Sequence, residues 1–474
     1  MRRYDMIICG DGASSVTLLY AMAKVVGAPL SVAIVGRSPV LGRGTAYATR
    51  CPAHVLNAPA GEMSADADDP LSFVRWLQGR GAATTNVTTN GDAVFALRDD
   101  YGSYLGALAE RAATRISNGL LRIEHVRTEA LGLLRRQNDW IVTTPGAALH
   151  AGVVVLATGN DMPAPIAGTF GPEVRLFVID NPWGPLEVRR DAPVLLLGSG
   201  LTAVDALLLL REHGHRGEII LLSRRGWFPC EHIAAELCAP LPTPFPATAS
   251  GLVRAIRKHL GPDPSPARVQ GFMRAMRPHW RRAWELLAAA EKRRFIRHGA
   301  TLWSVHRHRM PPSVASQIRG LIGHGVTVMR GRVRRISLDD DGMLAVDIAR
   351  AGTRSRLKVA RVVNCTGPNT DPDKTLDRFL LNILQSRLAR PGPAGIGLDV
   401  DSTHRVTAPD GTTHKTLFAM GALTRGKWWE ITAITEIARQ AAEIAASVSQ
   451  PLRATEATKV AVSGRMDLPR ARKP

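Results

Sequence analysis

The sequence lacks several features that would assign a protein to a class at once. Its 474 residues include five cysteines but no C-x-x-C pair. No uncharged apolar run approaches the roughly 20 residues that a membrane span needs. The N-terminus carries Arg2 and Arg3, but the apolar stretch that follows is short and ends at Gly10, unlike a signal peptide. We therefore expect a soluble, cytoplasmic protein with no membrane partner.

The cysteines also give no metal-binding pattern. Cys9 and Cys365 lie in apolar strand patterns and are expected in the core. Cys230, His232 and Cys238 are the one group in which metal ligands could be imagined, but their spacing fits none of the usual zinc patterns. We interpret them as unrelated residues of a loop and a helix start, and we expect no bound metal. The sequence also shows no hydrolase triad.

Acidic residues are scarce relative to basic ones, with 41 Asp or Glu against 61 Lys or Arg and a net charge of +20. The excess is concentrated between Arg254 and Arg319, where 15 Lys or Arg face 3 Asp or Glu. Three interpretations are open: basic surface helices, a site for an anionic substrate or a cofactor phosphate, or a nucleic-acid surface. Nucleic acid is the least favoured partner, because the segment contains no recognisable nucleic-acid-binding module.

Two short glycine patterns carry the strongest signal in the chain. Gly10-Asp11-Gly12 follows the apolar run 4–9, and Gly198-Ser199-Gly200 follows the apolar run 194–197. Each lies between a predicted strand and a predicted helix, where bare backbone N–H groups can meet a pyrophosphate at a helix N-terminus. A single Gly-x-Gly is weak evidence, but this pair predicts two dinucleotides bound by one chain. The usual purpose is to pass a hydride from a nicotinamide to a flavin.

The sequence around the two patterns repeats. Each is followed by a predicted helix, three short strands and an apolar strand that ends in Thr-Gly, at Thr158-Gly159 and at Thr366-Gly367. The short strands are expected at 121–126, 130–134 and 140–144, and again at 326–329, 333–336 and 344–348. Repetition with alternating strands and helices predicts duplicated parallel sheets. We expect an α/β fold with two Rossmann-like dinucleotide-binding domains, each with a three-stranded β-meander insertion, the second domain inserted into the first.

Further motifs, spread from residue 5 to about residue 440, carry a family likeness. In chain order they are Leu41-Gly42-Arg43-Gly44-Thr45-Ala46-Tyr47, His54-Val55-Leu56-Asn57-Ala58-Pro59 with Met63-Ser64, Phe73-Val74-Arg75-Trp76-Leu77, Arg98 with Tyr101-Gly102-Ser103-Tyr104, Gly200-Leu201-Thr202-Ala203-Val204-Asp205, Ser223-Arg224-Arg225-Gly226 and Trp429-Glu430-Ile431-Thr432-Ala433. Together with the glycine patterns they resemble the two-dinucleotide-binding flavoproteins, which include flavin-containing and N-hydroxylating monooxygenases. The closer likeness is to bacterial FAD/NAD(P)-binding proteins of the YdhS type, one branch of which hydroxylates urate. The resemblance implies FAD and NAD(P)H as cofactors.

The resemblance, combined with the proline and glycine clusters that mark domain junctions, predicts the domain ranges. The FAD-binding domain would begin as 1–177, and the NAD(P)H-binding domain would span 178–370. Residues 371–452 would return to the FAD-binding domain with a strand and an alanine-rich helix. Residues 453–474 are expected to form a polar tail.

In this resemblance the first glycine pattern binds FAD. Gly10 and Gly12 would let the backbone approach the FAD pyrophosphate, with Ser14 beside them and Ser15 in place of the third glycine of the fingerprint. At the end of the next strand a carboxylate normally binds the adenosine ribose, but this chain has Gly36-Arg37 there. Either ribose binding is altered, or Arg37 contacts the adenosine portion. Thr158 and Gly159 close the same expected site.

The second pattern would bind NAD(P)H. The residues expected to contact this cofactor are Gly198, Ser199, Gly200, Thr202, Ser223, Arg224 and Arg225. The two arginines stand where a carboxylate would favour NADH, and they suit the 2′-phosphate of NADPH. We lean to NADPH, with a solvated strand end as the alternative reading of the arginines.

Other residues are expected near the flavin ring. Asn57 could hydrogen-bond the isoalloxazine edge or could simply form a turn before a proline, and Met63 lies in the same loop. Gly421 and Thr432 belong to a C-terminal flavin motif, in which a helix N-terminus would stabilise negative charge on the reduced ring.

Two polar groups are candidates for the substrate side of the site. The first group is Arg98, Tyr101 and Tyr104, which could instead be an ordinary helix start. The second group is Trp303, His306, His308 and Arg309, which could instead be a surface loop. The second group could bind an anion and use a histidine as proton carrier. No catalytic residue is assigned, and the candidates are His308, Arg309 and Asn57.

A reduced flavin needs an electron acceptor. Disulfide reductases use a C-x4-C pair beside the flavin, which this chain lacks. Oxygen is the remaining natural acceptor. We expect an FAD-dependent monooxygenase that uses NAD(P)H and O2 through a C4a-hydroperoxyflavin to hydroxylate a small, anionic substrate, for which the resemblance suggests urate and hence a place in purine metabolism. The alternatives are an NAD(P)H-dependent flavin reductase acting on a quinone or a protein partner, and a non-enzymatic FAD- or nucleic-acid-binding protein.

Overall fold

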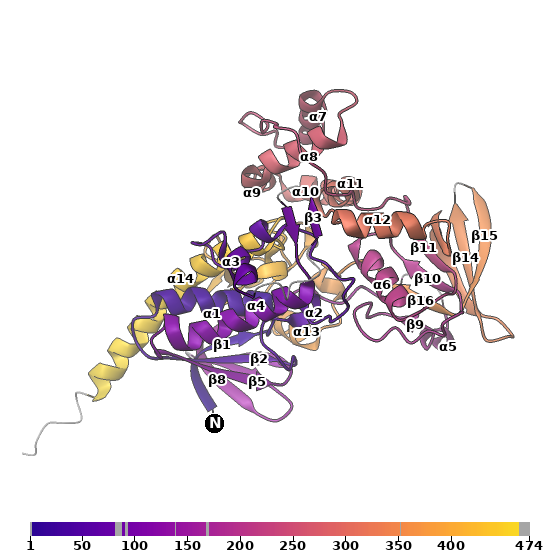
Figure 1. Cartoon of the computed structure of the whole chain (residues 1–474). Helices are drawn as coiled ribbons and strands as arrows, with labels where there is room; N and C mark the ends of the chain where they lie inside the picture. Colours follow the sequence, from indigo (N-terminus) through magenta and orange to yellow (C-terminus); the bar gives the residue numbers. More distant parts are fainter. Residues whose placement is uncertain are drawn as a thin grey trace, which may run out of the picture.

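Two parallel β-sheets form the body of the protein, and a group of short helices stands above the junction between them (Figure 1). The computed structural model describes residues 2–80, 88–90, 93–137, 139–166, 170–350 and 352–463. Among these residues, no helix combines the length and the apolar character that crossing a bilayer requires.

The first sheet has the strand order β17-β18-β8-β1-β2-β5. These strands are β1 (Arg2–Cys9), β2 (Leu30–Gly36), β5 (Leu121–Arg127), β8 (Ala148–Leu156), β17 (Arg405–Thr407) and β18 (Thr413–Ala419). All neighbours in this order run parallel except β17 and β18. Because β1 pairs with both β2 and β8, its C-terminal end lies in the middle of the sheet, and the first glycine turn begins there.

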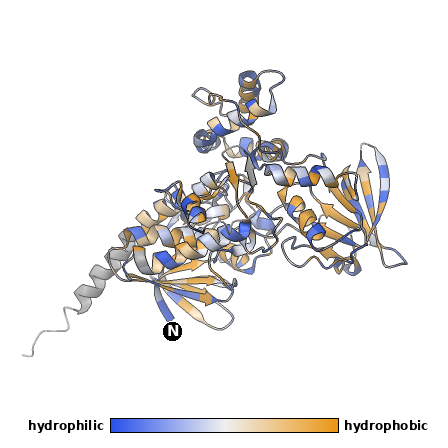
Figure 2. Cartoon of the chain, in the orientation of Figure 1, coloured by the Kyte–Doolittle hydropathy of each residue, from blue (hydrophilic) through white to orange (hydrophobic). Residues whose placement is uncertain are grey.

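Both faces of this sheet are buried, as expected for parallel strands. Side chains alternate along β1, so that Met6 and Ile8 join one buried cluster and Ile7 and Cys9 join the other. The helices that pack on the two faces are α1 (Ala13–Val25), α4 (Arg98–Arg111) and α14 (Ile434–Ser463) on the first, and α13 (Arg378–Gln385) on the second. Figure 2 shows the hydrophobic residues concentrated along the strands of both sheets.

The second sheet repeats the order of the first. Its order is β12-β11-β10-β16-β9, entirely parallel, with β9 (Val178–Ile179), β10 (Val194–Leu197), β11 (Ile219–Ser223), β12 (Val326–Arg330) and β16 (Arg361–Asn364). Helices α6 (Leu201–Glu212) and α12 (Pro312–Leu321) pack on one face. The predicted two-domain Rossmann-like α/β fold is therefore confirmed.

The β-meanders differ in detail from the expectation. In each repeat the first of the three short strands, β5 or β12, joins the parallel sheet instead of the meander. The first meander consists of β6 (Gly132–Arg136), β7 (Asp139–Thr143) and the start of β8. The second forms a separate sheet of β13 (Arg332–Leu338), β14 (Leu344–Arg350) and β15 (Thr353–Val359). The sequence analysis missed β15 because its residues are mostly exposed and give no apolar alternation.

A long segment connects β2 to β5 in the first sheet, and another connects β11 to β12 in the second. Between β2 and β5 lie α2 (Gly44–Tyr47), α3 (Ser72–Gly79), the short hairpin β3 (Thr88–Asn90) and β4 (Ala93–Phe95), and α4. Between β11 and β12 lie α12 and, before it, five helices that we call the helical insertion: α7 (Ala249–Leu260), α8 (Pro266–Ala275), α9 (Trp280–Glu285), α10 (Ala289–His298) and α11 (Ala300–Arg307). The insertion stands above the first sheet in Figure 1. It contains most of the basic segment noted in the sequence.

The helical insertion is joined to the first domain by polar contacts. Arg277 pairs with Glu62 at 2.6 Å and donates to Thr435 Oγ1 at 2.9 Å. Trp284 Nε1 donates to the carbonyl oxygen of Gly426 at 3.0 Å. Part of the basic segment is therefore used for contacts inside the molecule.

The C-terminal return ends in α14, which packs against α1. This helix continues to Ser463, beyond the expected range, so the segment predicted as a polar tail begins as a helix, and residues 464–474 lie outside the described residues. Gln440 of α14 binds the turn Gly421–Thr424: it accepts from Gly421 N at 2.7 Å and donates to Thr424 Oγ1 at 3.1 Å.

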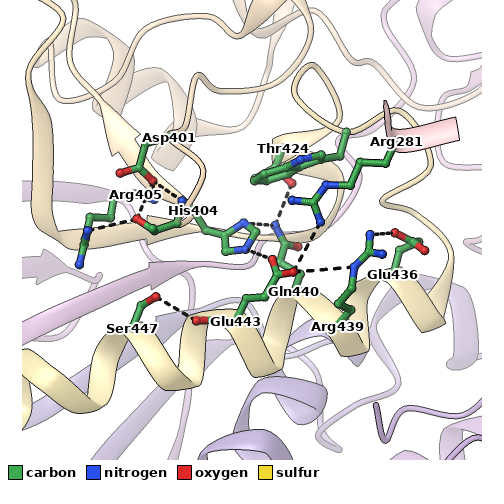
Figure 3. Close-up of polar contacts among 12 residues, drawn as sticks. Arg281, Asp401, His404, Arg405, Thr424, Glu436, Arg439, Gln440, Glu443 and Ser447 are labelled. Carbon is green, nitrogen blue, oxygen red and sulfur yellow. Dashed lines mark hydrogen bonds and ion pairs between the residues drawn. The ribbon is translucent and has the colours of Figure 1, made fainter. Parts of the chain in front are cut away.

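A buried histidine extends this network (Figure 3). His404 is 1% exposed, accepts a hydrogen bond from Gln440 at Nδ1 (3.1 Å) and donates from Nε2 to Glu443 (2.6 Å). Arg281 of the helical insertion lies 3.5 Å from the same carboxylate. The network therefore ties α14 to both the 421–424 turn and the insertion.

The stability of this network is expected to depend on pH. The hydrogen bond from His404 holds the pKa of Glu443 below its usual value. Its contribution is complete above the unfolded pKa of about 4.3, and it is lost as pH falls through the lower folded value. We expect Glu443→Gln to lower Tm by about 2–4 °C at pH 7, with the difference shrinking below about pH 4. Calorimetric scans across this range measure it. Glu110→Gln, at an exposed carboxylate of α4, is the control, and equal melting of E443Q and wild type at pH 7 contradicts the expectation.

Candidate functional site

The first glycine turn is held by close backbone packing between β1 and α1. Gly10 has φ +121°, and a Cβ there would lie 2.2 Å from the carbonyl oxygen of Ala157. Its N–H donates to Val35 O at 2.8 Å, which fixes the turn against the end of β2. Only glycine fits this conformation and this space. Gly12 precedes α1, so the free N–H groups of the first helical turn are available for an anion.

An open cavity of about 990 Å³ lies over this turn. Its walls come from the turn itself, the end of β2, Arg43 with α2, and the starts of α6 and α14. Eight residues predicted as cofactor contacts line it: Gly10, Gly12, Ser14, Arg37, Thr158, Gly159, Thr202 and Thr432. The structure therefore brings residues of the first glycine pattern, the C-terminal motif and the start of the helix after the second pattern to one space. The other predicted NAD(P)H contacts are not among the lining residues, namely Gly198, Ser199, Gly200, Ser223, Arg224 and Arg225.

Three other predicted residues pack behind the cavity wall. Ser15 is fully buried and donates from Oγ to Gly10 O at 2.7 Å, so the serine that replaces the third glycine ties α1 to the turn. Met63 lies in the buried core. Gly421 adjoins α1, because a Cβ on it would lie 2.8 Å from Ser14 Oγ. These positions support the cavity without lining it.

The second glycine turn repeats the geometry of the first. Gly198 has φ +129°, and a Cβ there would lie 2.2 Å from Cys365 O. Ser199 Oγ donates to the Trp227 carbonyl and lies 2.8 Å from Ser223 Oγ. Arg225 lies over the ring of Trp227, 4.7 Å from its centroid, and Arg224 is exposed. Polar and guanidinium groups thus gather at the end of β11, where a dinucleotide ribose would lie.

A buried ion pair connects the two domains at the cavity. Arg98 of α4 lies 2.8 Å from Asp205 of α6, and the two side chains are 13% and 11% exposed. His54 Nε2 lies 3.0 Å from the carbonyl oxygen of Asp205. Arg98 and Asp205 both line the cavity. Tyr101 and Tyr104, expected beside Arg98, instead lie in the core against Phe73.

The second candidate group lies in the contact between the helical insertion and the first domain. Arg307 pairs with Glu430 at 2.5 Å, and Arg309 donates to Gln270 at 2.5 Å. His308 Nδ1 lies 3.2 Å from Ser304 Oγ. Trp303 packs against the apolar clusters of the insertion. None of these residues belongs to the cavity lining.

Burial and nearby positive charges in this contact make His308 a poor proton carrier at neutral pH. Burial, with Arg307 and Arg425 nearby, lowers the pKa of His308 to about 3, so the ring is neutral at pH 7. Burial also lowers the pKa of Arg309 to about 10. Such a weakly basic histidine is poorly matched to proton transfer near neutral pH.

Asn57 and the cysteine group belong to the same contact. The carbonyl oxygen of Asn57 accepts from His232 Nε2 at 2.9 Å, and burial with Arg309 nearby lowers the pKa of His232 to about 4. Cys230 Sγ lies 3.5 Å from His306 Nδ1. Within the described ranges, no three His, Cys, Asp or Glu side chains are grouped so that they could hold a metal ion.

One side of the cavity was not predicted from the sequence. It consists of the two segments that cross between the domains, and the lining residues there include Asn160, Asp161, Asn181, Trp183, Asp377 and Phe379. The proline and glycine clusters that marked domain boundaries were the available signal, but they indicated chain breaks and not a binding surface.

The arrangement is the Rossmann-like two-domain flavoprotein fold. A family model described as FAD-NAD(P)-binding matches residues 7–161. Comparison with curated proteins found no match.

Solved structures similar to nearly the whole chain include three monooxygenases or hydroxylases and also bacillithiol disulfide reductases. The ornithine N-hydroxylase of Kutzneria sp. 744 has 16% identity and a TM-score of 0.65, covering 95% of this chain and 99% of that one. The FAD-bound cadaverine monooxygenase of Erwinia amylovora has 15% identity and a TM-score of 0.63, covering 95% of each chain. The L-lysine 6-monooxygenase of Pseudomonas syringae has 17% identity and a TM-score of 0.62, covering 94% and 99%. At these identities the likeness shows the fold.

The ion pair between the domains is expected to be sensitive to the loss of one partner. Arg98→Ala leaves the Asp205 carboxylate buried without its counter-charge, which typically costs about 3–5 kcal/mol. Urea unfolding monitored by tryptophan fluorescence measures this loss, and Arg98→Leu/Asp205→Leu should be less destabilised than Arg98→Ala. Arg356→Ala, which breaks the exposed pair with Asp347 on the meander, serves as the control and should change little. If R98A is as stable to urea as wild type, the ion pair does not contribute to the free energy of unfolding.

Proposed function

We propose that the protein is an FAD-dependent monooxygenase that oxidises NADPH. The observation that carries the proposal is the shared cavity. One space is lined by Gly10 and Gly12 of the first glycine turn and by Leu201 and Thr202, directly after the second. Two dinucleotides bound at these turns would therefore approach each other inside it, as hydride transfer requires.

The residues present fit FAD at the first turn. Gly10 and Gly12 line the cavity, so a pyrophosphate could approach their backbone there, and the start of α1 offers free N–H groups. Thr432 lies just before α14 and would face the flavin end of the cofactor. When bound, FAD would accept a hydride from the nicotinamide and deliver the electrons to oxygen. The protein would position both cofactors and limit water.

The cysteines support oxygen over a disulfide as acceptor. All five are free. Cys9 is buried at the end of β1, and Cys365 is buried directly after β16. Burial raises the pKa of both thiols, which disfavours the thiolate needed for exchange.

The substrate proposal covers two chemical classes. Urate is the substrate suggested by the sequence resemblance, whereas the similarly folded proteins are named for ornithine, cadaverine and lysine. Arg309, from the group that suggested an anion, already donates to Gln270, and its neighbour Arg307 pairs with Glu430. The assay should therefore include amines as well as urate.

Oxygen consumption tests the proposed function. Purified protein should be yellow or take up FAD, and it should oxidise NADPH faster when its substrate is present. An oxygen electrode with urate, ornithine, lysine and cadaverine should show one O2 consumed per NADPH, and mass spectrometry should show a product heavier by one oxygen atom. NADPH oxidation that continues without oxygen when a quinone is added supports the reductase alternative. Protein that takes up no FAD contradicts both.

The arginines after β11 should determine the choice of nicotinamide cofactor. Arg224→Ala/Arg225→Ala removes two charges suited to the 2′-phosphate, so KM for NADPH should rise by about 10- to 100-fold, as a loss of about 1.4–3 kcal/mol implies. KM for NADH should stay nearly constant. Steady-state NADPH oxidation measures both values, and Arg354→Ala, an exposed arginine of the meander, is the control. Equal losses for the two nicotinamides would show that the arginines do not read the phosphate.

A further inference from the structure

Asp11, the residue between Gly10 and Gly12, places its carboxylate beside the end of β2, where the sequence has no Asp or Glu. Asp11 lies in the first turn, and Gly36 ends β2. A Cβ built on Gly36 would lie 2.3 Å from both Cγ and Oδ2 of Asp11, and all three nearest atoms belong to that side chain. The Asp11 carboxyl group thus fills the space in which a side chain at position 36 would begin.

Backbone strain does not require glycine at position 36. Its φ lies outside the left-handed range, unlike that of Gly10. An L-residue could therefore adopt this backbone if the Asp11 side chain were absent. Occupancy by the Asp11 carboxylate is what excludes a side chain here.

Hydrogen bonds fix the orientation of this carboxylate. Oδ2 accepts from Ser38 N at 2.6 Å, and Oδ1 accepts from Ser38 Oγ at 2.9 Å. Asp11 is 9% exposed and lines the cavity together with Gly36 and Ser38. A carboxylate can accept about four hydrogen bonds, so two donors from a ligand can still be accommodated.

The neighbouring charged groups leave the carboxylate uncompensated. His125 Nε2 lies 3.7 Å from Oδ2, too far for a good hydrogen bond, and burial lowers the pKa of His125, so the ring is neutral at pH 7. Arg37 is 79% exposed and pairs with Glu129 at 3.1 Å. The Arg37 guanidinium is thus engaged by another carboxylate.

We propose that Asp11 binds the ribose hydroxyls of the dinucleotide at the first turn, in place of the carboxylate missing from the end of β2. The proposal rests on the proposed binding of FAD there. The two adjacent hydroxyls of a ribose are the two donors that the carboxylate can still accept, and a carboxylate at this edge of the sheet commonly has this role. Of the two sequence alternatives, altered ribose binding is the one this geometry favours over contact through Arg37.

An exchange of positions tests the proposal. Asp11→Gly should weaken FAD binding by about tenfold or more, the effect of losing charge-assisted hydrogen bonds of about 1.4 kcal/mol or more. Gly36→Glu alone should also weaken it, because the new side chain meets Asp11. Asp11→Gly/Gly36→Glu should restore the affinity to within a few-fold of wild type. Flavin fluorescence titrations of the apoprotein give the dissociation constants, and melting curves without flavin verify that each variant is folded.

Ligands that differ in the ribose separate recognition from a merely structural role. FMN lacks the adenosine, so its affinity should be the same in wild type and D11G. ADP should compete with FAD better than 2′,3′-dideoxy-ADP in wild type, and this preference should vanish in D11G.

Three results overturn the inference: D11G binds FAD as tightly as wild type, it loses FMN and FAD equally, or it keeps the preference for ADP over the dideoxy analogue. A wild-type protein that binds no FAD overturns the proposed function itself, and a flavin-binding wild type with an unaffected D11G overturns the inference alone.

Discussion

The contact between a glycine and the carbonyl of a neighbouring strand organises both halves of this protein. At Gly10 and at Gly198 the missing side chain would lie 2.2 Å from a carbonyl oxygen, that of Ala157 or Cys365. Any larger residue would push β1 away from β8, or β10 away from β16, at the end where the helix starts. Because the strand order is also the same, the two turns present their helix starts in equivalent ways. The placement of both proposed cofactor sites depends on this contact.

Ion pairs between distant parts of the chain engage several of its arginines. Arg98 is paired with Asp205 across the domains, and Arg277 and Arg307 join the helical insertion to Glu62 and Glu430. These guanidinium groups are partly or largely buried and already bonded. Each is paired with a carboxylate, so these three arginines add nothing to the net charge of +20 and are not free for an external anionic partner.

The repeated strand–turn–helix units could be predicted from the sequence, but the surroundings of individual side chains, which depend on long-range contacts, could not. Glycine turns, apolar strands and the Thr-Gly closures are local patterns that predict the fold. Together with the family resemblance, which supplied Thr432, they gave eight residues of the cavity lining. Tyr101 and Tyr104 could not be assigned, since whether a helix face meets the core or a cavity depends on what packs against it. His308 is a similar case, because its low pKa arises from Arg307 and from Arg425, which is distant in the sequence. The role of Asp11 also needed the structure, since its proximity to Gly36 depends on the pairing of β1 with β2.

The chain passes between the domains twice, and both crossings line the cavity. Any rotation of one domain against the other would move Asn160 and Asp377 and so would reshape the space between the two helix starts. A ligand that fits one shape better must then favour one orientation of the domains, and the orientation must alter ligand affinity by the same free energy. The affinities for the two proposed cofactors would therefore be coupled to the angle between the domains, and such a rotation would have to break the Arg98–Asp205 pair.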